Sequence, residues 1–158
     1  GKLNAISLEA IQGAQKIAEK SNGSVSAITF NKMAADSLTQ YNLSEVLYID
    51  NPKLKSYNPL YYLSAMEQAF QQELPDMIIF GHTYETRDWV PRLSARLDVP
   101  FISDCIAFEF NNDLTLVRSI YQGKFNANYT INSKGSIASF QSGAFKVDDI
   151  QQISKVND

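Results

Sequence analysis

The fold of this chain is decided by residues 77–88, which read MIIFGHTYETRD. The first four residues are apolar without interruption, which is typical of a strand covered on both faces, as in a parallel sheet. Gly81 ends this run, and the polar residues after it lead into a predicted helix over about Asp88–Leu97. A buried strand followed at once by a helix is the repeating unit of α/β folds, so we expect that class.

Helices and strands are predicted to alternate upstream of this stretch as well. Apolar side chains recur at steps of three and four over residues 8–18, which indicates one face of a helix. Ser7 is its expected N-cap, and Asn22-Gly23 is its expected end. The further predicted elements are a strand at Val25–Phe30, a helix at Lys32–Tyr41, a strand at Val46–Ile49 and a helix at Leu60–Gln72. This order favours a parallel sheet with crossover helices.

The last third of the chain has a different character. Turn-forming residues at 111–113 and 132–135 separate short apolar segments at hairpin-type spacing. The strands predicted here are Phe101–Ser103, Ala107–Phe110, Leu114–Ser119, Phe125–Thr130 and Ser136–Phe140. The expected fold is therefore a three-layer αβα arrangement with a mostly parallel sheet, plus a C-terminal antiparallel β section.

The two ends of the chain carry separate expectations. The sequence opens with a predicted helix, whereas a right-handed α/β core usually begins with a strand near the centre of the sheet. Either this fold starts differently, or an apolar strand precedes Gly1. At the other end, residues 147–158 show no strong pattern and are predicted to be a linker or a fraying tail.

Composition and charge argue against several classes of function. The 158 residues hold 14 Lys and Arg against 17 Asp and Glu, a net charge of −3, which disfavours a nucleic-acid-binding surface. One cysteine, Cys105, and one histidine, His82, do not suffice for an internal disulfide or a Cys/His metal cluster. No apolar run approaches the roughly 20 residues of a membrane-spanning helix, and no signal peptide is expected. We expect a soluble protein of a reducing compartment.

The strand-to-helix junction is the first candidate site. In open α/β sheets ligands bind beyond the carboxyl ends of the strands, and a helix N-terminus attracts anions. Thr83, Thr86 and Arg87 are placed to line such a site, although no glycine-rich phosphate motif is present. The alternative interpretation is a capped helix with Arg87 in a structural salt bridge.

Acid–base chemistry is a second possibility at this junction. His82 is close in sequence to Glu85 and Asp88, and a histidine with a carboxylate can transfer protons. Cys105 lies in an apolar stretch and is expected to be an inert core thiol. A small hydrolase that uses Cys105 and His82 is the hypothesis that the sequence supports least.

Two further groups of residues are candidates for binding. Arg118 and Tyr121 lie beside a predicted turn in which Gly123 suggests a positive φ. In one interpretation their side chains contact a cofactor or a partner. In the other, the segment is a tight connection between two strands, and Tyr121 packs on the core. Arg87, Arg92 and Arg96 recur at spacings of five and four. They form either an anion- or partner-binding stripe or a solvated helix face.

Several short motifs occur in the order that they have in a known family. The chain opens with GKLNAISLEA over residues 1–10, and residues 86–92 (TRDWVPR) resemble a Gly-Arg-Asp-x-x-Pro-Arg segment. Residues 118–124 (RSIYQGK) resemble an Arg-Pro-x-Tyr-x-Gly-Asn stretch. Residues 141–145 (QSGAF) resemble an Arg-x-Gly-x-Phe strand. Over residues 1–146 the chain therefore resembles the N-terminal domain of the electron transfer flavoprotein alpha subunit. The departures from these motifs are Thr86, Ser119, Lys124 and Gln141, and His82 stands where the family usually has a small residue.

The resemblance implies a fold and a division of labour between domains. The fold is adenine-nucleotide alpha-hydrolase-like, or Rossmann-like, with its first strand upstream of Gly1. Residues 1–146 form the scaffold domain, and residues 147–158 lead towards a separate domain that holds most contacts to FAD. FAD is expected in the full-length protein but not on this domain alone. We therefore expect no catalytic or metal-binding residue here, and only Thr83, Arg87, Arg118, Tyr121 and Gly123 as weak cofactor-binding candidates.

The resemblance also implies partners. The domain is expected to form a heterodimer with an electron transfer flavoprotein beta subunit, and the aromatic candidates for its interface are Trp89, Phe125, Tyr129 and Phe145. The whole protein carries electrons from flavoprotein dehydrogenases to a membrane quinone oxidoreductase, and some anaerobic relatives bifurcate electrons from a nicotinamide cofactor. It is a carrier rather than an enzyme, in the bacterial cytoplasm or the mitochondrial matrix. The alternative function is a stand-alone nucleotide-binding α/β module.

Overall fold

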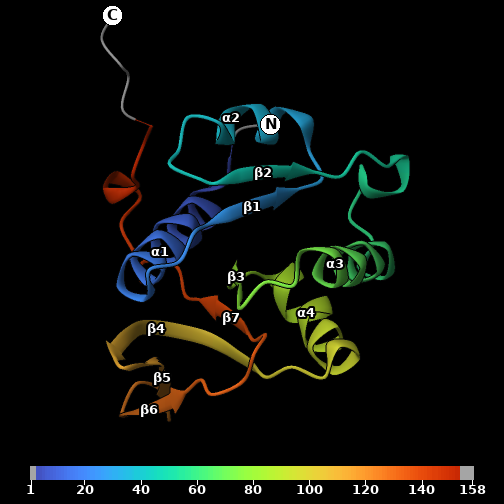
Figure 1. Ribbon diagram of the computed structural model, residues 1–158. Coiled ribbons are helices and arrows are strands. Elements are labelled where there is room, and N and C mark those ends of the chain that lie inside the picture. The colour runs from blue at the N-terminus through green and yellow to red at the C-terminus, as the bar shows by residue number, and fades with distance from the viewer. Residues whose placement is uncertain (1–2, 154–158) are drawn as a thin grey trace, which may run out of the picture.

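Helices cover both faces of the strands in the computed structural model, which describes residues 3–153 (Figure 1). The helices are α1 (Ala5–Ser21), α2 (Lys32–Leu38), α3 (Pro59–Glu73) and α4 (Tyr84–Leu97), with short 3-10 turns η1 (Pro52–Leu54) and η2 (Val147–Asp149). The apolar faces of α1 and α2 pack on one side of the strands, and those of α3 and α4 pack on the other. The three-layer αβα class predicted from the sequence is confirmed.

The strands form two sheets. The smaller sheet pairs β1 (Ser26–Thr29) in parallel with β2 (Glu45–Tyr48). The larger sheet has the order β3-β7-β4-β5-β6, and its strands are β3 (Ile78–Gly81), β4 (Phe101–Asn111), β5 (Asp113–Ile120), β6 (Phe125–Thr130) and β7 (Ile137–Phe140). β3, β7 and β4 are parallel, whereas β4, β5 and β6 form an antiparallel meander. The sheet is mixed, with the expected antiparallel section at one end.

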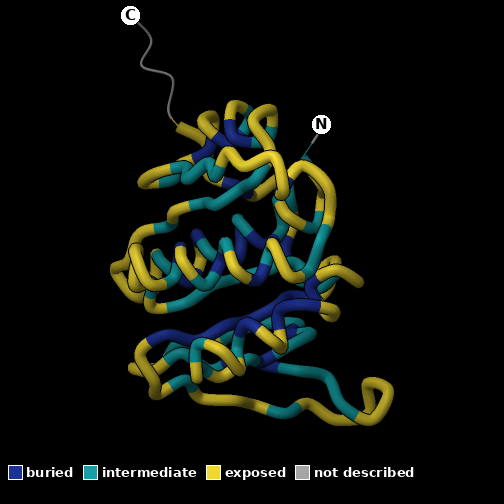
Figure 2. The backbone as a smooth tube through the Cα atoms, turned by 90° about the vertical axis from the view of Figure 1, so that its right-hand side faces the viewer, coloured by how far each residue is buried: buried dark blue, intermediate teal, exposed yellow. Residues whose placement is uncertain are grey.

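The position of β7 corrects the prediction for residues 136–140. Hairpin-type spacing placed this segment in the antiparallel section, but β7 lies between β3 and β4 and runs parallel to both. Ala138 is paired with Ile79 on one side and with Ile102 on the other. All four residues of β7 are buried, as a central parallel strand requires (Figure 2). Spacing along the chain therefore did not identify the partners of this strand.

Most predicted elements are present with shifted boundaries. α1 begins at Ala5 with Asn4 rather than Ser7 as its N-cap, and α4 begins at Tyr84, one turn earlier than predicted. The strands predicted at 101–103 and 107–110 are a single strand, β4, with a bulge between Ile102 and Cys105. Each helix within residues 3–153 is too short or too polar to cross a membrane.

The segment after β7 packs across α1. The ring of Phe145 lies against Gly13 of α1 and meets the ring of Phe140 edge-on, with 4.8 Å between centroids. Further along, the Gln15 side chain accepts from the Gln151 backbone N–H at 2.9 Å and donates to the Gln151 carbonyl at 3.1 Å. The chain is therefore held to α1 beyond residue 146. The assignment of 147–158 as a linker towards another domain stays a prediction, and residues 154–158 lie outside the described part.

We expect Gly13→Ala to destabilise the protein. Alanine within a helix is usually favoured over glycine by about 1 kcal/mol. Here the added Cβ would lie 2.4–2.9 Å from three ring carbons of Phe145, so overpacking at a cost of about 1–3 kcal/mol outweighs that gain. Urea unfolding measures the difference in the free energy of unfolding.

Gly23→Ala is the matched control for this prediction. Gly23 is exposed just after α1, and an added Cβ there makes ordinary contacts of 3.4 Å or more. We expect this variant to stay within about 0.5 kcal/mol of the original chain. A stabilised Gly13→Ala variant would show that Phe145 does not lie over α1.

Candidate functional site

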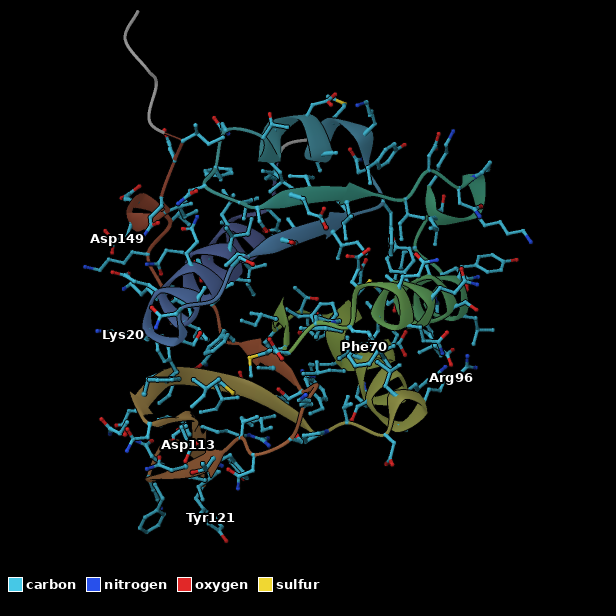
Figure 3. All side chains as sticks on the ribbon, viewed as in Figure 1. Lys20, Phe70, Arg96, Asp113, Tyr121 and Asp149 are labelled. Carbon is cyan, nitrogen blue, oxygen red and sulfur yellow. The ribbon has the colours of Figure 1, made fainter. Side chains whose placement is uncertain are left out.

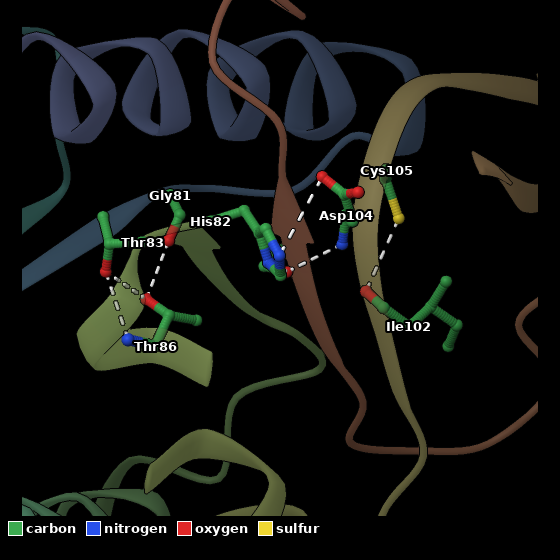
Figure 4. A network of polar contacts seen from close by, with 8 residues as sticks. Gly81, His82, Thr83, Thr86, Ile102, Asp104 and Cys105 are labelled. Carbon is green, nitrogen blue, oxygen red and sulfur yellow. Dashed lines mark hydrogen bonds and ion pairs between the residues drawn. The ribbon is translucent and has the colours of Figure 1, made fainter. Parts of the chain in front are cut away.

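Three strands bring a polar cluster together at the carboxyl end of β3. His82 follows β3, Ser139 lies on β7, and Asp104 lies in the bulge of β4 with a φ of +58° (Figure 4). His82 Nδ1 is 2.9 Å from Ser139 Oγ, which also accepts from the Asp104 backbone N–H at 3.0 Å. His82 Nε2 lies 4.0 Å from Asp104 Oδ1. We call these three residues the His82 cluster.

The His82 cluster favours a neutral imidazole. Burial lowers the pKa of His82, and the negative charge of Asp104 offsets only part of this effect. A neutral ring that accepts from the Ser139 hydroxyl at Nδ1 and carries its proton on Nε2, towards Asp104, satisfies this geometry. Ser139 is fully buried, so its hydroxyl is out of reach of a substrate. The cluster joins three strands and lacks an accessible nucleophile.

The residues predicted to assist His82 do not do so. Asp88 accepts from the Tyr57 hydroxyl at 2.6 Å and lies 3.8 Å from Arg92, and Glu85 is exposed. Burial and the bond to Asp88 raise the pKa of Tyr57 to about 12, so this bond persists at neutral pH. The carboxylate nearest to His82 is Asp104, which adjacency in the sequence did not identify. It becomes a neighbour only through the pairing of β4 with β7.

Cys105 is a core thiol. It is fully buried, and its Sγ lies 3.5 Å from the Ile102 carbonyl oxygen. Burial raises the pKa of the thiol to about 12, so the reactive thiolate is scarce at neutral pH. These properties contradict the hydrolase hypothesis, which needed Cys105 as a nucleophile.

The two threonines at the start of α4 form hydrogen bonds with backbone groups of the protein itself. Thr83 Oγ1 accepts from the Thr86 backbone N–H at 3.1 Å, and the Thr86 hydroxyl donates to the Gly81 carbonyl at 2.8 Å. The predicted capped helix is therefore present. Arg87 is exposed and lies over the Tyr84 ring at 5.8 Å. Within residues 3–153 no carboxylate forms an ion pair with Arg87, so the salt bridge expected there is wrong.

The arginines further along α4 have structural partners. Arg92 pairs with Asp88 on its own helix, and Arg96 Nη1 lies 3.1 Å from Glu67 Oε2 of α3. These contacts favour the interpretation as a solvated helix face over that as an anion-binding stripe.

The candidates on β5 and its turn are divided between two places. Arg118 is paired with Cys105 across the sheet, and its positive charge lowers the pKa of His82 further, as does that of Arg87. Tyr121 and Gly123 lie instead at the tip of the β5–β6 hairpin, where Figure 3 shows Tyr121 projecting outward. Gly123 has a φ of +83°, as the sequence suggested, but Tyr121 is 73% exposed and does not pack on the core.

An exposed aromatic patch runs along β6. Phe125 and Tyr129 are 63% and 41% exposed, and Tyr121 meets Phe125 edge-on at 5.9 Å between centroids. We call Tyr121, Phe125 and Tyr129 the β6 aromatic patch. The other two interface candidates, Trp89 and Phe145, are only 5% and 8% exposed. They are core residues, because Trp89 packs among the rings beneath α4 and Phe145 packs on α1.

Comparison with known proteins gives a consistent result. Residues 1–157 match the family described as "Electron transfer flavoprotein domain". The chain is 34% identical over 128 residues to the electron transfer flavoprotein subunit alpha of Bacillus subtilis, covering 78% of this chain and 39% of that protein. It is 23% identical over 151 residues to the same subunit of Syntrophomonas wolfei, covering 93% and 46%. It is 30% identical over 108 residues to the "acryloyl-CoA reductase electron transfer subunit beta" of Anaerotignum propionicum, covering 66% and 29%. The chain spans less than half the length of these curated relatives.

We expect His82 to titrate below its ordinary pKa of 6.5. Because His82 is the one histidine of the sequence, its imidazole resonances can be followed by NMR without assignment. Below about pH 6.5 the unfolded chain binds a proton at His82, whereas the folded chain, with its lower His82 pKa, does not. The free energy of unfolding therefore falls as the pH drops below about 6.5, until the folded pKa is passed.

His82→Asn is the variant that isolates this effect. It removes the titrating group, so we expect a flatter dependence of stability on pH between about 7 and 5.5. Urea unfolding of both proteins over this range measures the two slopes. Equal slopes, or a histidine pKa at or above 6.5, would contradict the arrangement of the His82 cluster.

Proposed function

The chain belongs to the electron transfer flavoprotein family, and from this premise we propose that it is the N-terminal scaffold domain of an alpha subunit. We propose that it pairs with a beta subunit in an FAD-containing heterodimer, which carries electrons from dehydrogenases to a quinone oxidoreductase in the bacterial cytoplasm. The observation that carries this proposal is the family match over residues 1–157. The name "subunit alpha" of several relatives supports an assembly with another chain.

A scaffold role for this domain is supported by the chemistry of its polar residues. The His82 cluster is closed by its own hydrogen bonds, and Cys105 is buried with its pKa raised. Within residues 3–153 no group of three or more His, Cys, Asp or Glu side chains is placed to hold a metal ion. The domain then contributes by holding other parts of the assembly in position.

FAD, the cofactor that the family implies, does not fit the residues at the carboxyl ends of β3, β7 and β4. A diphosphate needs several free donors, but the hydroxyls of Thr83, Thr86 and Ser139 are engaged within the protein. Of the residues predicted to line a site at this junction, only Arg87 keeps a side chain without a hydrogen bond or ion pair to the described residues. The carboxylate of Asp104 adds a charge that repels phosphate. We therefore propose that FAD is held by another domain of the full-length protein.

Calorimetry tests this assignment against the nucleotide-binding alternative. We expect the isolated chain to show no saturable heat with FAD, AMP or ATP at concentrations up to about millimolar, which corresponds to a binding free energy weaker than about −4 kcal/mol. Saturable binding of AMP or ATP would favour the alternative, a nucleotide-binding module. Saturable binding of FAD would contradict the placement of the cofactor.

The β6 aromatic patch is the surface that we propose for the beta subunit. β6 is an edge strand of the larger sheet, and aromatic side chains are enriched in protein interfaces and their hot spots. The exposed ring surfaces of Phe125 and Tyr129 lie on the same face of β6, because side chains two and four positions apart point the same way. A partner that covers these rings would remove a large apolar area from water.

We expect Phe125→Ser combined with Tyr129→Ser to weaken binding of the beta subunit encoded in the same genome at least about tenfold. A biosensor titration, with the beta subunit immobilised and each purified chain in solution, measures the dissociation constants of the original chain and the double variant. Leu60→Ser is the control, since Leu60 is 59% exposed, close to the 63% of Phe125, but lies on α3. If the original chain does not bind the beta subunit, the pairing is wrong. If it binds and the double variant binds equally well, only the choice of surface is wrong.

A further inference from the structure

A row of three aromatic rings leads from the core beneath α4 to the surface. Trp89, the one tryptophan of the sequence, is buried on α4. Its ring centroid lies 6.0 Å from that of Tyr62 on α3, and the ring of Tyr62 lies 5.3 Å from that of Tyr57, just before α3. Each ring meets the next edge-on, and Tyr57 is 39% exposed. We call Trp89, Tyr62 and Tyr57 the ring row. It connects the core with solvent through continuous aromatic contact.

The outer end of the ring row carries a proton acceptor. The Tyr57 hydroxyl donates to Asp88 Oδ2 at 2.6 Å, a distance typical of a hydrogen bond to a charged oxygen. Because burial and this bond raise the pKa of Tyr57 to about 12, the side chain is a neutral phenol at pH 7. A phenol gives up an electron more readily when its proton leaves at the same time, since the phenol radical cation is a strong acid. The Asp88 carboxylate is placed to take that proton.

The rings beside the row are phenylalanines. Phe80 lies 5.5 Å from Trp89, and Phe30 lies 4.8 Å from Tyr62, in each case between ring centroids. A phenylalanine has no hydroxyl, and its ring is much harder to oxidise than that of tyrosine or tryptophan. Of the described rings that contact Trp89, only Tyr62 is therefore able to pass an electron to it. The contacts among the described residues thus leave one direction for electron transfer, from Tyr57 through Tyr62 to Trp89.

We propose that the ring row moves an oxidising equivalent out of the core: when a strong one-electron oxidant, such as an oxygen-derived radical, takes an electron from Trp89, the oxidation ends as a neutral radical on Tyr57. The oxidant gains one electron and leaves an indole radical cation. An electron from Tyr57 passes through the Tyr62 ring and restores the indole, while the phenolic proton of Tyr57 moves to the Asp88 carboxylate. This activity lies beyond the scaffold role and does not depend on it.

Flash photolysis of the purified chain tests the ring row. Light at the long-wavelength edge of the aromatic absorption excites tryptophan but not tyrosine, so it ejects an electron from Trp89 alone. A cobalt(III) ammine complex in the solution takes up that electron and, once reduced to cobalt(II), does not return it. Tryptophan and tyrosyl radicals absorb at different visible wavelengths, so transient absorption follows both. Because the sequence has eight tyrosines, variants identify the one that is oxidised.

In the original chain we expect the tryptophan radical to decay at the rate at which a tyrosyl radical appears. Tyr57→Phe removes the end point, so we expect the tryptophan radical to decay at least about tenfold more slowly. Tyr61→Phe is the matched control: Tyr61 is 42% exposed, close to the 39% of Tyr57, but its ring faces Lys53 Nζ at 5.3 Å rather than the ring row. We expect this control to behave like the original chain.

Asp88→Asn tests the proton acceptor separately. Asparagine keeps an oxygen that accepts the hydrogen bond but is no base, so we expect the transfer to slow at least about tenfold. An unchanged rate in this variant overturns the role of Asp88. Equal decay in the original chain and in Tyr57→Phe overturns the whole proposal, as does a rate that rises with protein concentration, because the electron then comes from a second molecule. None of these outcomes depends on FAD or on the beta subunit.

Permanent damage to Trp89 gives an independent readout. A radical on the exposed Tyr57 is within reach of a small reductant such as ascorbate, whereas an indole radical that persists in the core reacts further with oxygen. After repeated flashes in the presence of oxygen and ascorbate, we expect mass spectrometry to find several times more oxygenated Trp89 in Tyr57→Phe than in the original chain or in Tyr61→Phe. Equal oxidation of Trp89 in the three chains contradicts the proposed path.

Discussion

The structure depends on the burial of β7 between β3 and β4. This four-residue strand is the only one of the larger sheet that is buried at every position in the part of the chain described. Ile137 packs into the cluster beneath α3 and α4, while Ala138 and Phe140 pack into the cluster beneath α1. Because side chains alternate across the sheet, one short strand anchors both helical layers. The C-terminal third of the chain is in this way built into the centre of the domain.

The same strand explains the polar cluster at the edge of the sheet. Ser139 lies on β7 beside the end of β3, and its hydroxyl forms hydrogen bonds with His82 and with the backbone N–H of Asp104. A buried polar group costs free energy unless it is paired, and here each of the three residues supplies a partner for another. The geometry of the cluster ties strands together and leaves no open reaction centre.

In the function that we propose, the domain acts through the surfaces and edges of its larger sheet. The β6 aromatic patch lies at the outer edge of the larger sheet, and an apolar cleft lined by residues of α1, β1, α3 and β3 lies at its opposite edge. An unpaired sheet edge can pair with a further strand or bind a partner. Both edges of this sheet carry apolar side chains, whose burial is favourable. Under the proposed function, such a domain holds other parts of a flavoprotein in position, and the redox chemistry belongs to the cofactor.

Elements with local signals could be predicted from the sequence. The apolar run at 77–80, the periodicity of α1 and the positive φ of Gly123 each depend on residues close in the chain, and the ordered motifs identified the family. The pairing of the strands and the contacts between polar groups emerge only in the folded protein. Residues 136–140 look like any short strand after a turn, and Asp104, Ser139 and His82 are brought together from up to 57 positions apart. Local propensity reports the conformation of a segment, whereas its partners are chosen by the burial and hydrogen bonding of the whole core, which no single segment encodes.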